Sequence, residues 1–187
     1  VLSSLGAVLT LPGIAGIVLT IGIAVDANAP TAKLLGTEAV PHTYDAATGV
    51  LELQGESLGT VVVDASTKDI VDTVDWSKLQ WNVDGNGSTT LDFAREDVAS
   101  AIVSDDGTKL TVTLSSAGKS AVSALSGFGG TGTDADTIDV SAGLLRDGAG
   151  NLSSATSTAT SAVELLDDTA PVLGEINIFG EFFDLIY

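Results

Sequence analysis

Short loops rich in carboxylate and amide oxygens are the part of this chain with the clearest chemical potential. Residues 84–88 (Asp-Gly-Asn-Gly-Ser) and 147–151 (Asp-Gly-Ala-Gly-Asn) each combine an Asp and an Asn with glycines. Calcium takes about six to eight oxygen ligands of this kind, so a calcium site is one interpretation. The other is ordinary turn chemistry, because Asp-Gly and Gly-Asn are common turn sequences. The candidate calcium ligands are Asp26, Asn28, Asp147, Asn151, Asp167 and Asp168.

Residues suited to catalysis are scarce. The chain has one histidine, His42, and no cysteine, which excludes disulfides, thiol catalysis and cysteine-ligated zinc. No nucleophile pairs with His42, so we expect a solvated loop histidine. The Ser-Lys stretch at 115–119 lacks the spacing of a phosphate-binding loop, and the Gly-rich residues 127–132 are expected to form a flexible loop. We therefore expect no catalytic residue, no cofactor-binding residue and no enzyme.

Charge is mostly acidic and unevenly distributed. The 187 residues carry 7 Lys+Arg against 25 Asp+Glu, a formal net charge of −18, which argues against nucleic acid as a partner. Residues 1–25 contain no charged side chain. A helix of that length spans a hydrocarbon core of roughly 30 Å. We predict a hydrophobic helix over residues 1–29, placed in a membrane or in the core of a filament; a buried helix of a soluble domain is the alternative.

Part of this apolar stretch is similar to a known membrane segment. Residues 5–28, LGAVLTLPGIAGIVLTIGIAVDAN, resemble a transmembrane segment of SecD, a membrane subunit of the bacterial protein-export machinery. The resemblance implies a membrane-type helix and makes an export component one functional alternative. It covers about an eighth of the chain and stops at Asn28, where Ala29-Pro30-Thr31 replaces the family's apolar, charged run.

From Pro30 onward, short alternating apolar and polar runs separated by turn residues predict β-strands. This alternating pattern favours an antiparallel β-sandwich. Ser115 or Ser116 is suited to cap a short helix. Trp76 and Trp81 are expected in the core, and Asp105-Asp106 is expected at a hairpin tip. The expected strands are 50–54, 60–64, 79–83, 89–93, 101–103, 109–114, 137–141 and 161–166, with hairpins over 79–93 and 101–114.

Three stretches of this β region resemble the Ig-like repeats of large bacterial surface proteins and adhesins. They are residues 43–55 (TYDAATGVLELQG), 74–79 (VDWSKL) and 139–153 (DVSAGLLRDGAGNLS), with linker-like DDTAP at 167–171 and DANAP at 26–30. The resemblance implies an Ig-like domain over residues 30–171 that serves as a spacer or display platform. The predicted fold class is therefore mainly β: an Ig-like antiparallel β-sandwich preceded by one N-terminal hydrophobic α-helix.

The final residues, 172–187, form an apolar tail that holds three of the five phenylalanines. Glu175 and Glu181 interrupt it, and it is too short to span a membrane. We expect it to be buried, either as an edge strand of the sandwich or as a strand added to a neighbouring subunit.

Two functional hypotheses agree on the class of protein, a non-enzymatic extracellular structural protein. The first is a pilin-like filament subunit, with the helix in the fibre core after a membrane-bound stage and the β domain outside; Leu5 departs from the Glu that bacterial type IV pilins usually carry there. The second is a membrane-anchored, adhesin-like, calcium-binding surface module. Expected partners are further copies of the chain, through the N-terminal helix and the C-terminal tail.

Overall fold

The computed structural model describes residues 31–130, 135–156 and 162–166, which form a mainly β module with one α-helix. The predicted N-terminal helix and the C-terminal tail lie outside the described residues. The elements in chain order are β1 (Lys33–Leu34), β2 (His42–Asp45), β3 (Val50–Glu56), η1 (Leu58–Val61), η2 (Trp76–Lys78), β4 (Leu79–Val83), β5 (Thr89–Asp92), η3 (Arg95–Asp97), β6 (Val98–Val103), β7 (Lys109–Leu114), α2 (Ser116–Ser123), β8 (Thr137–Val140) and β9 (Val163–Leu166).

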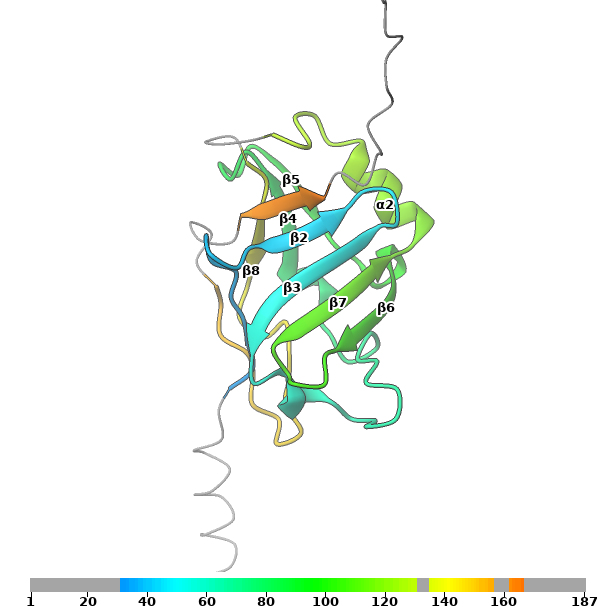
Figure 1. The fold of residues 1–187 in the computed structure, drawn as a ribbon, viewed down its shortest axis with the longest axis vertical. Helices are drawn as coiled ribbons and strands as arrows, with labels where there is room; N and C mark the ends of the chain where they lie inside the picture. The colour runs from blue at the N-terminus through cyan, green and yellow to red at the C-terminus, as the bar shows by residue number, and fades with distance from the viewer. Residues whose placement is uncertain (1–30, 131–134, 157–161, 167–187) are drawn as a thin grey trace, which may run out of the picture.

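The described strands form two sheets. The larger has the order β6-β7-β3-β2-β9, with β1 also paired to β3, and the smaller has the order β5-β4-β8. In Figure 1 the larger sheet faces the viewer and β4 and β8 lie behind it. The mainly β, two-sheet prediction is confirmed. The predicted antiparallel arrangement holds for the other ladders between the described strands but was wrong for β9, which runs parallel to β2.

Local sequence accounts for most of these elements. In β7 the apolar residues Leu110, Val112 and Leu114 alternate with half-buried Lys109, Thr111 and Thr113, the period of a strand with one face in the core. The two predicted hairpins are confirmed by the β4–β5 and β6–β7 pairings. The predicted helix cap is also confirmed, since the Ser115 hydroxyl accepts a hydrogen bond from the Gly118 N–H at 3.2 Å.

The predicted strand at 60–64 was wrong. Its first residues belong to the 3-10 helix η1, where Val61 is buried, and Val63 is 76% exposed. A β-branched run becomes a strand only where a neighbouring strand can pair with it, and no ladder includes these residues in the described structure.

An aromatic cluster joins the two sheets. Tyr44 of β2 meets Trp81 of β4 edge-on at a centroid distance of 5.1 Å, and Phe128 lies 6.1 Å from Tyr44 and 5.7 Å from Trp81. Trp76 is also buried, and its indole N–H donates to the Val71 carbonyl at 2.9 Å. The prediction that both tryptophans belong to the core is confirmed.

The last described segment closes one side of the sandwich by contacting both sheets. Thr156 forms a bridge with Val140 and Ala162 a bridge with Thr137, both on β8, before β9 pairs with β2. The Val163 N–H still donates to the Asp136 carbonyl at 2.9 Å. Thr156 and Ala162 therefore contact the smaller sheet, whereas β9 belongs to the larger one.

Candidate functional site

The loop at residues 147–151 closes on its own carboxylate. One oxygen of Asp147 accepts the N–H groups of Ala149 (3.0 Å) and Asn151 (2.8 Å), and the other accepts the Asn151 amide at 2.9 Å. These bonds, the Asn151 side chain first, hold the pKa of Asp147 below its ordinary value. The arrangement is that of an Asx turn, in which three hydrogen bonds occupy three of the roughly four acceptor positions of the carboxylate.

The loop at residues 84–88 also has turn geometry. Asp84, Gly85 and Gly87 have φ values of 60°, 59° and 76°, and the Gly87 N–H donates to the Asn82 side chain at 2.9 Å. These residues join β4 to β5, as the predicted hairpin requires. Within the described residues no group of three or more His, Asp or Glu side chains could hold a metal ion.

The remaining candidate calcium ligands, Asp26, Asn28, Asp167 and Asp168, lie outside the described residues. Calcium binding by the chain stays a prediction.

His42 was expected in a solvated loop, and this was wrong. It is the first residue of β2 and is fully buried. Its Nδ1 accepts the Gln54 N–H at 3.0 Å, whereas its Nε2 has no hydrogen-bond partner. A Cβ added at Gly36 would lie 2.9 Å from Nε2, so backbone packs directly against the ring. Burial lowers the pKa of His42 to about 4.

A buried carboxylate next to the aromatic cluster was not predicted from the sequence. Asp136 is 1% exposed, and its Oδ2 accepts the Trp81 indole N–H (3.0 Å) and the Gly129 N–H (3.2 Å). Its Oδ1 has no hydrogen-bond partner. The available signal was alternation, because Asp136 shares the inward parity of Ile138 and Val140. This carboxylate ties β4, β8 and residue 129 together.

A polar pocket of about 390 Å³ opens beside the smaller sheet. Gln80, at the centre of this sheet, pairs with Asp92 of β5 on one side and Asp139 of β8 on the other. The Gln80 amide donates to Asp92 at 2.5 Å, and Asp139 accepts the Asn82 amide at 3.0 Å. Gln80 is thus engaged with Asp92 and Asn82 with one oxygen of Asp139, whereas Oδ1 of Asp139 is buried without a hydrogen-bond partner.

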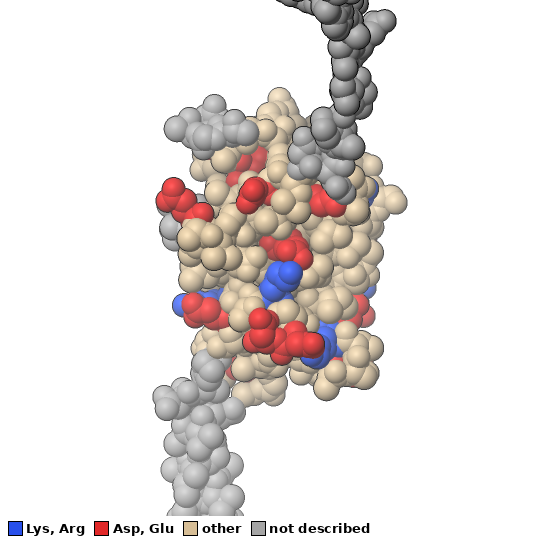
Figure 2. Space-filling model, viewed as in Figure 1, with Lys and Arg blue, Asp and Glu red and all other residues tan. Residues whose placement is uncertain are grey.

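Charges on the larger sheet are mostly acidic with isolated cations among them. Figure 2 shows blue patches set between red ones over this face. Lys109 of β7 forms an ion pair with Glu52 of β3 at 2.8 Å, and Lys33 pairs with Glu56 at 3.3 Å. Such exposed pairs contribute about 0–1 kcal/mol each to stability.

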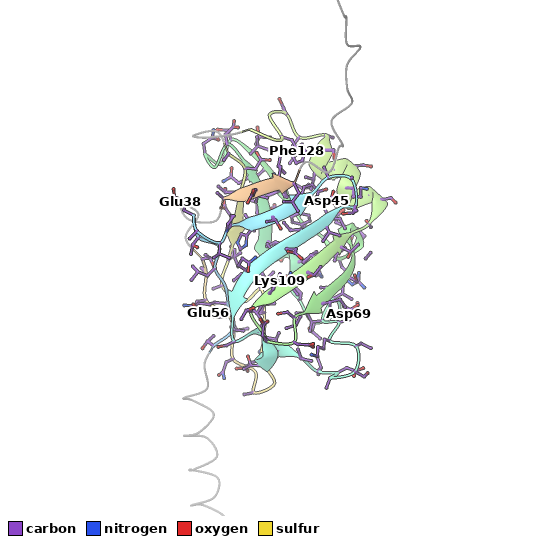
Figure 3. All side chains as sticks on the ribbon, in the orientation of Figure 1. Glu38, Asp45, Glu56, Asp69, Lys109 and Phe128 are labelled. Atoms are coloured by element: carbon purple, nitrogen blue, oxygen red, sulfur yellow. The ribbon has the colours of Figure 1, made fainter. Side chains whose placement is uncertain are left out.

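The two terminal strands leave the module at opposite ends of the larger sheet. Lys33 of β1 pairs with Glu56, the last residue of β3. Asp45 pairs with Val50, the first residue of β3, and also with Leu166, the last residue of β9. Figure 3 labels Asp45, which lies beside the first residue of β3, and Glu56, the last residue of β3. A seven-residue strand is about 20 Å long, so the flanking segments are held apart by at least that distance.

Comparison with known proteins gives few relatives. No family model matches the chain, and no curated protein is similar to it. Two solved structures are similar in part: the S-layer protein rSbsC (20% identity, TM-score 0.37, covering 87% of this chain and 18% of that one) and the surface layer protein SbsC, domains 1–6 (20% identity, TM-score 0.36, covering 80% and 16%). The chain spans less than a fifth of either protein's length. At this identity and TM-score, no function follows from the likeness.

Proposed function

We propose that this chain is a non-enzymatic structural protein of the cell surface, in which the β module of residues 30–171 acts as an in-line spacer. The observation that carries the proposal is the exit of β1 and β9 at opposite ends of β3. A module with this connectivity adds its own length between the segments that flank it. The acidic composition, with a net charge of −18, suits a hydrated surface that repels its neighbours.

The first form of this proposal is a pilin-like filament subunit. Residues 1–25 carry no charge, and such a segment can rest in a membrane and then pack against copies of itself in a fibre core. The β module would then lie outside the core. Among the described residues no helix is long and apolar enough to cross a membrane, so the filament proposal depends on the sequence of residues 1–29.

The second form is a membrane-anchored, adhesin-like module that binds calcium. It is favoured by the oxygen-rich pairs at the two predicted module ends, Asp26 with Asn28 and Asp167 with Asp168. Electron microscopy of native material separates the two forms. Fibres with a regular repeat support the filament, whereas particles that remain on membranes support the anchored module.

Surface location is tested by thiol labelling, because the natural chain has no cysteine to give background. Val63 is 76% exposed and Val112 is fully buried, so V63C and V112C form a matched pair in the full chain. A membrane-impermeant maleimide should label V63C on intact cells and should label V112C only after denaturation. Labelling of V63C only after cell lysis would contradict a surface location.

A further inference from the structure

Tension on the flanking segments would act along the strands of the larger sheet. Lys33 lies at the Glu56 end of β3, and Leu166 lies at the opposite end beside Asp45. β9 runs toward its own exit, since Val163 pairs with His42 and Leu166 with Asp45. A pull on the C-terminal side therefore draws β9 along its axis and not sideways out of the sheet.

On the N-terminal side the first resistance comes from β1. This strand has two residue pairs with β3, and the Leu35 N–H adds a bond to the Gln54 carbonyl at 2.8 Å. Once β1 has separated from β3, the force is transmitted through residues 35–41 and acts on the His42 end of β2. β2 and β9 are then drawn in opposite directions along their common axis.

We propose that the β2–β9 ladder (His42–Asp45 with Val163–Leu166) is the element that resists tension in this module, an inference that rests on the proposed spacer function. In this geometry the strands slide past each other, so the four residue pairs share the load. The Val163 N–H bond to Asp136 and the burial of Tyr44 against Trp81 tie both strands to the smaller sheet. Residues 46–162 lie between the two strands in sequence and carry no tension while the ladder holds.

Force spectroscopy on the full chain tests this, with pulling points set by paired cysteines. Val40, Ala162 and Leu166 are all exposed. Pulling between V40C and L166C applies force at opposite ends of the ladder. Pulling between V40C and A162C applies force at one end of the same ladder, so that its residue pairs separate one after another. The first pair should rupture at a force at least roughly twofold higher at equal loading rate, because forced unfolding follows the barrier met along the pulling direction. Equal forces would overturn the proposal.

Two further measurements test the proposal without relying on the comparison of those two pulling geometries alone. T31C with L166C should give a small first step of roughly 3 nm as residues 33–41 extend, followed by a main step of roughly 40 nm as residues 42–166 extend. A single step without the small one would contradict the order of events.

The second measurement is a ladder variant. Because the Val163 N–H faces Asp136 and peptide groups alternate along a strand, the Glu164 N–H faces β2. E164P removes that donor and should lower the V40C/L166C rupture force while leaving the V40C/A162C force nearly unchanged. An unchanged V40C/L166C force in folded E164P would overturn the assignment. Cell location does not enter these forces, so this proposal and the spacer proposal fail separately.

Discussion

Acid should destabilise this module through His42, which is buried and has a lowered pKa in the folded state. The ring nitrogen that would take the second proton, Nδ1, already accepts the Gln54 N–H at 3.0 Å. Protonation there would set two N–H donors against each other inside the core, next to Gly36. The folded state therefore holds His42 neutral, with its pKa lowered from 6.5 to about 4.

The direction and size of the change in unfolding free energy with pH follow from proton linkage. A lowered folded pKa means that the unfolded chain binds the proton first, so stability is complete above pH 6.5 and falls as the pH drops toward 4. The slope is about 1.4 kcal/mol per pH unit within this window. The loss is about 2.5 kcal/mol between pH 7 and pH 4.5, and the corresponding fall in Tm is roughly 5–10 °C for a domain of this size.

The assay is urea unfolding of the wild type and H42N at pH 7, 6, 5 and 4.5. Asn keeps an acceptor for the Gln54 N–H and does not titrate. H42N should therefore be less stable than the wild type at pH 7, and its unfolding free energy should lack the fall of about 1.4 kcal/mol per pH unit. The carboxylates with lowered pKa values, Asp45, Asp64, Asp106 and Asp147, lose their contribution only as the pH falls below about 3.8. Parallel curves for the two proteins would refute the role given to His42.

Three other outcomes are expected. Millimolar calcium should raise Tm by about 5 °C over chelator, with magnesium as the screening control; a shift that persists in D147A assigns the ion to the end pair Asp26 and Asp167, and equal melting in all three solutions refutes a calcium site. G118A should cost about 1–3 kcal/mol in urea unfolding, because the new Cβ would lie 2.3 Å from the Asp97 carbonyl oxygen. G59A, whose Cβ would meet nothing within 4 Å, should change stability little, and equal losses would contradict the packing argument. Deletion of residues 1–29 should leave a soluble, folded monomer by circular dichroism and sedimentation, and an unfolded or oligomeric product would contradict the predicted domain boundary.

The elements that could be predicted from the sequence are those specified by neighbouring residues. The hairpins β4–β5 and β6–β7 follow from alternation around Gly-containing turns, and α2 follows from the Ser115 cap. Likewise, the turn at Asp106 is made by bonds from Ser104 and Thr108. In each case the information lies within about ten residues of the element.

What could not be predicted depends on partners far away in the sequence. The sequence His-Thr-Tyr-Asp at 42–45 is typical of a polar loop. His42 becomes a core residue because Gly36 and Gln54 pack around its imidazole ring. The β2–β9 pairing has no local signal, because a parallel partner can come from any later strand. The Asp147 loop is limited in a different way, because its partners are local: its residue types fit calcium and a turn equally, and only the bonds from Asn151 to Asp147 show the turn geometry.

The β2–β9 ladder also sets when the module can fold. His42 and Val163 pair across about 120 residues, a long loop closure of the kind that slows folding. During synthesis β2 has no partner on one side until Leu166 has been made, so the larger sheet stays incomplete while the rest of the chain emerges. Among the described strands, the one that completes the larger sheet is therefore the last to be synthesised.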